Sequence, residues 1–146
     1  IASLHAKKNN IKIKYLNKSP EQMNHKIKYD VILNLEIVEH VDNLNLYLKS
    51  CSNLLKKNGV MFTATINRTV VSYIKAIIGA EYVMRWLPIG THNWNKFVRP
   101  EELETKLTKL GFSLKDVSGL SFNPILNEWK KSKDFSVNYI LTVKKN

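Results

Sequence analysis

The sequence predicts an α/β fold in which a mainly parallel sheet ends in an antiparallel pair of strands. Strand-like and helix-like segments alternate from residue 29 to residue 110, which is the order of a layered α/β domain. The apolar residues 31–33 are typical of a strand that is covered on both faces. The last two strand-like segments, residues 112–122 and 137–145, are joined by about 14 residues, which is too short for a helical crossover and suits an antiparallel pair.

The composition is that of one ordinary globular domain. The chain has 146 residues, of which 44% are hydrophobic and 24% are charged, so residues 1–146 are expected to form a single domain. No apolar run reaches the roughly 18 residues that are needed to cross a bilayer. The lone Cys51 excludes an internal disulfide, and its leucine neighbours suggest a buried thiol.

The net charge of +11 could indicate a polyanionic partner. However, the positive charge is nearly all lysine and is scattered along the chain, and no cluster of arginine and aromatic residues resembles a nucleic-acid-reading surface. We therefore expect no nucleic-acid partner, whereas attraction to an anionic membrane surface stays open.

The first elements are two strand patterns on either side of a polar connection. Residues 1–9 read as the end of a helix, and residues 11–16 alternate apolar and basic side chains with the period of a half-exposed strand. Residues 17–28 are the polar connection. Residues 29–35 form the second expected strand, which contains the apolar run.

A helix is expected over residues 44–57, because apolar side chains recur there at helical spacing, at Leu44, Leu48, Cys51, Leu54 and Leu55. Asp42 or Asn43 can cap its first turn. Asn58 and Gly59 are expected to end it in the left-handed conformation.

A strand, an apolar helix and an amphipathic helix follow. The strand is expected at residues 60–66, and residues 70–87 form a mostly apolar helical segment. Pro100 opens the last helix with acidic residues in its first turn, and Gly111 ends it.

Three segments carry a resemblance to a known family. The first is residues 29–41, where a strand leads into Glu36, Glu39 and His40. The second is residues 65–68, and the third extends over residues 79–83, 87–94, 96–97 and 100–103. Further matches lie at residues 119–120, 122–124 and 137–139. Together they resemble the ubiquinone-biosynthesis O-methyltransferase family (3-demethylubiquinol / 2-polyprenyl-6-hydroxyphenol methylases) of class I S-adenosylmethionine (SAM) methyltransferases, over essentially the whole chain.

The resemblance implies a Rossmann-like sheet that ends in an antiparallel hairpin, and SAM-dependent O-methylation of a polyprenylated phenol or catechol. It also implies a glycine-rich turn after the family's first strand and an acidic residue after its second, both of which hold SAM. All five glycines of this sequence are isolated. We therefore expect an N-terminally truncated SAM-methyltransferase domain in which the family's first two strands are missing.

This expectation has a physical consequence. In the family's sheet the two strands lie between the strand at residues 11–16 and the strand at residues 29–35. Without them, residues 31–35 form an exposed apolar edge, which favours aggregation or pairing with a separate N-terminal fragment. The alternative to a working enzyme is an inactive fragment or an assembly module that cannot bind SAM alone.

The resemblance places Leu35 in the wall of the SAM pocket and residues 17–21 near the adenine. Leu35 could instead be an ordinary core leucine. Glu36, Glu39 and His40 are hard and borderline metal ligands, and the resemblance implies Mg²⁺ at these residues. A divalent ion would lower the pKa of a phenol, which is about 10 when unperturbed, and methyl transfer to oxygen needs the phenolate. Alternatively, the Glu-His pair braces the turn after the strand through hydrogen bonds.

His92 lies in the loop between the apolar helix and the next helix, where it could be the general base for the substrate hydroxyl. The alternative is a surface or structural histidine. Asn93 stands where many relatives carry aspartate, which weakens a histidine–carboxylate relay at that point.

Residues 67–99 are expected to form an inserted helix and loop for substrate or membrane contact. Within them, residues 70–87 are too short and too charged to span a bilayer, but they could lie in its interface with Trp86 at headgroup depth. They could also form a helix that simply covers the core. We expect a cytoplasmic protein that is peripheral to the inner face of a membrane.

Overall fold

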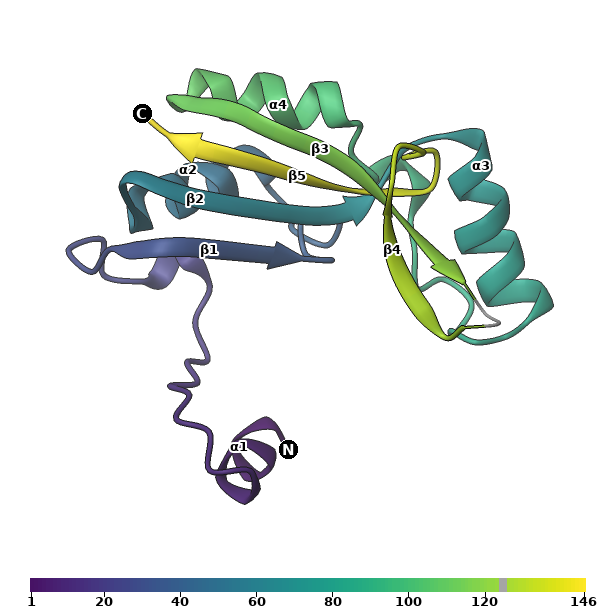
Figure 1. The fold of residues 1–146 in the computed structure, drawn as a ribbon, viewed down its shortest axis with the longest axis horizontal. Helices are drawn as coiled ribbons and strands as arrows, with labels where there is room; N and C mark the ends of the chain where they lie inside the picture. The colour runs from purple at the N-terminus through teal and green to yellow at the C-terminus, as the bar shows by residue number, and fades with distance from the viewer. Residues whose placement is uncertain (124–125) are drawn as a thin grey trace.

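In the computed structural model, which describes residues 1–123 and 126–146, these residues form a sheet of five strands in the order β1-β2-β5-β3-β4 (Figure 1). The strands are β1 (Tyr29–Leu35), β2 (Leu55–Ile66), β3 (Phe112–Asn123), β4 (Glu128–Ser132) and β5 (Asn138–Lys145). β1 and β2 are parallel, whereas β5 lies antiparallel to both β2 and β3. The α/β class and the antiparallel ending are therefore confirmed. Pro124, part of the resemblance, lies outside the described residues.

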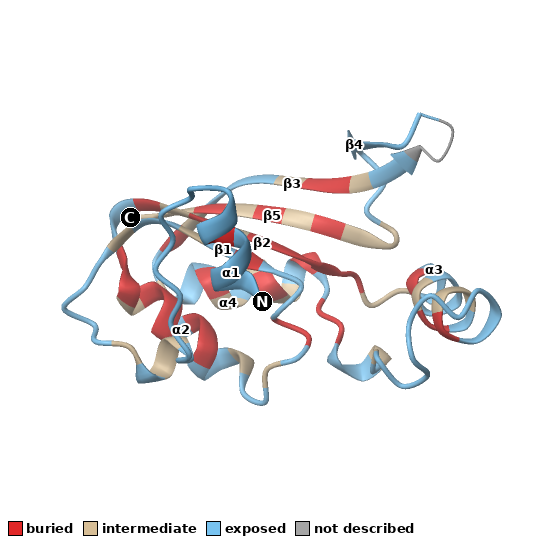
Figure 2. Ribbon diagram, turned by 90° about the horizontal axis from the view of Figure 1, so that it is seen from below, coloured by how far each residue is buried: buried red, intermediate tan, exposed pale blue. Residues whose placement is uncertain are grey.

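Two helices cover one face of the sheet. α2 (Leu44–Leu54) and α4 (Pro100–Lys109) lie on the same side, with their buried faces toward the strands (Figure 2). The main core joins them to β2 and β5, and its most buried members include Leu48, Cys51, Met61, Leu103, Leu107, Tyr139 and Leu141. Burial of these apolar side chains supplies the main drive for folding. The prediction of a buried Cys51 thiol is confirmed.

The boundary between α2 and β2 differs from the prediction. α2 ends at Leu54 and β2 begins at Leu55, so the residues expected to end a helix lie inside a strand. Asn58 adopts a left-handed φ of 63°. The register between β1 and β2 shifts at this point, since Tyr29 pairs with Leu55 whereas Val31 pairs with Val60. The Asn-Gly signal was real, but it marks a bulge rather than a helix end. At the other end of α2, Asn43 caps the helix by accepting a hydrogen bond from the Leu46 N–H at 3.0 Å.

The strand predicted at residues 11–16 is wrong. α1 (Ala2–Lys8) is followed by an extended, unpaired segment that leads to the short 3-10 helix η1 (Pro20–Gln22), and Figure 1 shows α1 well apart from the sheet. Alternation alone does not make a strand when no neighbour offers its backbone for pairing. Within the described residues β1 is the edge strand, and half or more of the residue surface is exposed at Val31, Leu33 and Leu35.

The connection between the last two predicted strands contains a strand of its own. β4 pairs with β3 in an antiparallel hairpin, with Gly119 opposite Ser132 and Phe122 opposite Trp129. Its sequence is mostly charged and carries no apolar alternation, so its formation depends on the cross-strand contact, in which the Phe122 and Trp129 rings lie 5.1 Å apart.

The segment between β2 and α4 forms a helix and a long loop at the carboxyl end of β2. α3 (Val70–Ser72) continues directly as the π-helix η2 (Tyr73–Val83), which ends four residues before the predicted limit of 87. A loop then leads to the 3-10 helix η3 (Trp94–Lys96). The Trp94 indole N–H donates to the Thr69 carbonyl at 3.0 Å, so the two ends of the segment are held together.

Gly119 permits a close approach of the chain to itself. A Cβ atom built there would lie 1.8 Å from the Asp134 carbonyl oxygen, which is backbone and cannot turn away. We expect Gly119→Ala to lower the free energy of unfolding by about 1–3 kcal/mol, measured by urea denaturation. Ser121→Ala, at an exposed position of the same strand, is the control and should have little effect. Equal stability of both variants would contradict the described β4–β5 connection.

Candidate active site

The candidate site lies where β1 and β2 end side by side. Because the two strands are parallel, their carboxyl ends lie at the same end of the sheet, which is where open α/β sheets bind ligands. Leu35 is paired with Ala64, and the next residue, Glu36, extends the ladder by donating its N–H to the Ala64 carbonyl at 2.9 Å. Glu36 has a left-handed φ of 51°, so the chain turns sharply as it leaves the sheet.

A pair of carboxyl groups follows this turn. Glu39 is buried, and its Oε2 accepts a hydrogen bond from the Thr65 hydroxyl at 2.7 Å. Its other oxygen, Oε1, is buried without a hydrogen-bond partner among the residues that the structure describes. Desolvation of the Glu36 carboxyl, and then the neighbouring Glu39 carboxyl group, raise the pKa of Glu36 to about 7. Glu36 therefore binds a proton as the pH falls to about 7.

His92 is held by a buried carboxylate from η2. The Nδ1 atom of His92 lies 2.9 Å from Oε1 of Glu81, and the side chain of Glu81 is 1% exposed. The ring of His92 also lies edge-on to Phe97, with 5.8 Å between the ring centres, and 6.5 Å from the ring of His40. His92 is therefore not a surface histidine, and it lies beside the turn that carries the carboxyl pair.

Glu81 is the functional candidate that the sequence analysis missed. In the sequence, Glu81 is one of the charges that argue against a membrane span, and the position next to His92 that would suit a relay is Asn93. Asn93 in fact caps η3, where its Oδ1 accepts from the Asn95 N–H at 3.1 Å. The available signal was one acidic residue in an apolar helical stretch, since such a residue is either exposed or paired.

The predicted metal ligands do not form a cluster. Across residues 1–123 and 126–146, no three His, Cys, Asp or Glu side chains converge as a metal-binding group, although Glu36 and Glu39 are neighbours. His40 instead lies exposed beside His92. The hydrogen bond from Thr65 ties Glu39 to the end of β2, and no hydrogen bond between His40 and Glu36 or Glu39 is seen among the described residues.

The predicted SAM-side residues line an open surface. Leu35 is 55% exposed, so it is not a core leucine. Four residues of the predicted adenine region, Lys18 to Glu21, face the loop after β1 across a pocket of about 540 Å³, which is also lined by Ile37, His40 and Tyr47. The carboxyl end of β1 thus has exposed apolar surface and an adjacent pocket.

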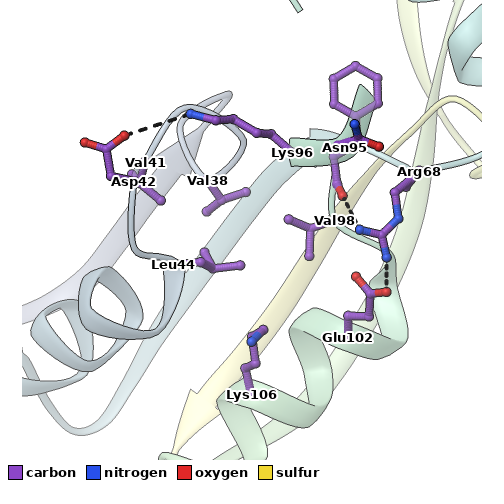
Figure 3. A pocket seen from close by; sticks show the side chains of 11 residues that line it. Val38, Val41, Asp42, Leu44, Arg68, Asn95, Lys96, Val98, Glu102 and Lys106 are labelled. Carbon is purple, nitrogen blue, oxygen red and sulfur yellow. Dashed lines mark hydrogen bonds and ion pairs between the residues drawn. The ribbon is translucent and has the colours of Figure 1, made fainter. Parts of the chain in front are cut away.

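A second pocket, of about 460 Å³, lies between the loop after β1, the η3 segment and α4 (Figure 3). Arg68 crosses it, pairing with Glu102 and donating to the Phe97 carbonyl at 3.3 Å. Lys96 lies 3.9 Å from Asp42 on the other side. Arg68 and Lys96 thus face acidic partners, and the contacts of Arg68 hold the loop that carries His92 against α4. We assign no ligand to this pocket.

No helix in the described part of the chain is both long and apolar enough to cross a membrane. The helix formed by α3 and η2 is nevertheless poorly covered. Its exposed apolar residues, with the loop that follows, are Val70, Val71, Tyr73, Ile74, Ile78, Tyr82, Val83, Met84, Trp86, Leu87 and Ile89.

Comparison with known protein families identifies a methyltransferase pattern. A family model described as "Methyltransferase domain" matches residues 3–117. The chain is 54% identical over 146 residues to a ubiquinone biosynthesis O-methyltransferase of Pelagibacter ubique and 44% identical over 147 residues to one of Bartonella tribocorum. All of this chain is covered in both comparisons, and it spans 61% and 60% of the two relatives.

Solved structures agree in fold. A SAM-dependent methyltransferase of Thermotoga maritima, described as a possible histamine N-methyltransferase, matches with a TM-score of 0.66 at 18% identity, covering 99% of this chain and 69% of that one. The magnesium protoporphyrin IX methyltransferase of Synechocystis PCC 6803 with bound S-adenosylhomocysteine (SAH) matches with a TM-score of 0.64 at 15% identity, covering 99% and 57%. At these identities the likeness shows the fold alone.

The carboxyl pair predicts a titration near neutral pH. The carboxyl carbon of Glu36, followed by ¹³C NMR, should titrate at about pH 7, and in Glu39→Gln its pKa should fall toward 4.5 because a negative neighbour is lost. The folded-state pKa is raised, so the free energy of unfolding should decrease as the pH rises from 4.5 to about 7. Glu101→Gln, an exposed change on α4, is the control. A Glu36 titration near 4.5 in the unchanged protein would contradict the pairing.

Proposed function

We propose that this chain, which belongs to the methyltransferase-domain family, acts in SAM-dependent O-methylation of a polyprenylated phenol or catechol in ubiquinone biosynthesis. The observation that carries the proposal is the pair formed by the partly buried His92 and the buried Glu81 carboxylate, beside the carboxyl ends of β1 and β2. Relatives named for this reaction at up to 54% identity support it. The chain spans about three fifths of the length of those relatives, so its substrate and its activity are proposals.

The chemistry needs a group that removes a proton from a weak acid. A phenolic hydroxyl has a pKa of about 10, so it is mostly protonated at neutral pH and is a poor nucleophile. His92 has one ring nitrogen engaged by Glu81, which leaves Nε2 for the substrate. As the phenolic oxygen forms its bond to carbon, its proton passes to Nε2. SAM, when bound, supplies the methyl group and leaves as SAH.

Glu39 offers a place for a second ring oxygen. Its Oε1 atom is buried and unpaired within the described residues, which is costly unless a ligand supplies a donor. A catechol carries a second hydroxyl that can donate to this oxygen. Glu39 would then orient the ring while His92 takes the proton, and Thr65 would keep the carboxylate in place.

The metal and cofactor assignments differ in their support. Leu35 and the pocket that contains Lys18 to Glu21 would hold part of SAM through apolar contact and shape. Mg²⁺ stays a prediction. Its three proposed ligands do not converge among the described residues, and the mechanism above takes no step through a metal. Its test is the rate of methyl transfer after chelation and after Mg²⁺ is added back.

The inserted helix is proposed to lie on an anionic membrane surface. Ile77 belongs to a small core with Ile66 and Phe97, so this helix does cover part of the core. Most of its other apolar residues point outward, and the chain carries a net charge of +11. Such a surface would place a substrate with a long prenyl chain next to the His92 loop.

A second candidate is a module that cannot bind SAM by itself. It is favoured by the isolated glycines and by the exposed edge of β1. Isothermal titration of the 146-residue chain with SAM decides between the two, because micromolar binding would exclude the module.

Substitution of His92 tests the proposed base. We expect His92→Asn to lower kcat by about 10²–10⁴-fold, since the amide can still contact Glu81 but cannot take the phenolic proton. The measurement is transfer of a tritiated methyl group from SAM to a short-chain prenylated catechol by the protein. His25→Asn, in an exposed turn, is the control. Unchanged turnover in His92→Asn would exclude the base, and no transfer by the unchanged protein would exclude the function.

Membrane contact is tested by vesicle sedimentation. The double variant Val83→Ser with Trp86→Ser should bind phosphatidylglycerol vesicles at least about tenfold more weakly, because it loses two exposed apolar side chains. Leu4→Ser with Ile13→Ser, which removes two exposed apolar side chains from the N-terminal segment, is the matched control. If both variants lose binding equally, or if neither does, the inserted helix is not the contact surface.

A further inference from the structure

We propose that Glu81 is a positioning residue that holds the His92 ring with its hydrogen on Nδ1, so that Nε2 is free to accept the substrate proton. This inference rests on the proposed function, and it adds a residue from the inserted helix to the reaction. It follows from what surrounds the Glu81 carboxylate.

Each oxygen of that carboxylate faces a hydrogen-bond donor. Oε2 accepts from the Gly90 N–H at 2.7 Å, and Oε1 accepts from the His92 N–H at 2.9 Å. Oε1 also lies 2.9 Å from the His92 ring nitrogen Nδ1. Burial by itself would raise the pKa of Glu81, but the hydrogen bonds from Gly90 and His92 outweigh it and hold that pKa below its usual range. The carboxyl group is therefore ionised at neutral pH.

An ionised carboxylate fixes the tautomer of the ring that it contacts. It has acceptor oxygens and no hydrogen to give, so the nitrogen facing it must carry the hydrogen. A neutral imidazole has one such hydrogen, and with Nδ1 protonated the lone pair lies on Nε2. The base that phenol deprotonation requires is thus set by Glu81.

The same carboxylate fixes where the ring points. Glu81 comes from η2, while His92 lies eleven positions later in a loop that turns back on itself through Gly90, whose φ is +86°. Phe97, which is 1% exposed, packs edge-on against the His92 ring. His40 is the remaining ring nearby, at 6.5 Å. Rotation of the His92 ring would break its contact with Glu81 and leave the buried carboxylate with the backbone donors of Gly90 and His92 alone, which is unfavourable.

A purely structural role for Glu81 makes a different prediction. If the carboxylate only anchored the backbone N–H groups of the loop, its loss would lower stability without changing the ring hydrogen. Glu81→Gln separates the two roles. The glutamine keeps the size, but its NH₂ group replaces one acceptor with a donor.

The test is long-range ¹H–¹⁵N correlation NMR on the protein labelled with ¹⁵N-histidine, at a pH where the His92 ring is neutral. In the unchanged protein we expect a protonated Nδ1 and an unprotonated Nε2. In Glu81→Gln we expect a mixture of tautomers or the reverse. Glu101→Gln, at an exposed position, is the matched control and should leave the pattern unchanged.

Two results would overturn the inference: a hydrogen on Nε2 in the unchanged protein, or the same tautomer in Glu81→Gln as in the parent. The first needs no variant, so a poorly folded Glu81→Gln protein would not prevent the test. Methyl transfer is measured separately, where we expect Glu81→Gln to lower kcat at least tenfold with little change in KM. A protein with the expected tautomer but no methyl transfer would refute the proposed function and leave the positioning role standing.

Discussion

The parallel pairing of β1 with β2 is the constraint on which the rest of the structure depends. The carboxyl ends of both strands lie at the same end of the sheet. The turn that contains Glu36 and Glu39 and the segment after Ile66 therefore start from neighbouring points. Thr65, one residue before the end of β2, donates a hydrogen bond to Glu39 at this end of the sheet. An antiparallel pairing would have placed these groups at opposite ends of the sheet.

The segment between β2 and α4 then places further polar side chains near that end of the sheet. Trp94 and Arg68 hold it near its ends, through the Thr69 carbonyl and through Glu102 of α4. Between these points the buried Glu81 carboxylate contacts the partly buried His92 ring. A buried charge is stable only when donors surround it, so Glu81 links the fold of the loop to the tautomer that we propose for His92.

Local signals in the sequence were sufficient for several elements. The strand at Tyr29–Leu35 and the helix that opens at Pro100 were predicted correctly, because each carries its own pattern and its own start or stop residue. Residues 11–16 have a strand pattern without a strand beside them, and β4 has a partner but no pattern. Both errors arise because pairing depends on residues far away in the sequence.

The candidate site was predictable in part for the same reason. Glu36, Glu39, His40 and His92 were identified as polar residues at expected places, and the structure brings His40 beside His92. Their arrangement was not predictable, because the partner of His92 is Glu81, whose burial only the folded chain reveals. Whether three ligands converge is also a property of side-chain directions rather than of spacing.

The most direct test of this account is a crystal structure of the protein with SAH and a catechol. The account predicts one ring hydroxyl about 3 Å from Nε2 of His92, with Nδ1 still bonded to Glu81. A catechol whose hydroxyl groups make no hydrogen bond to His92, directly or through one water, would contradict it.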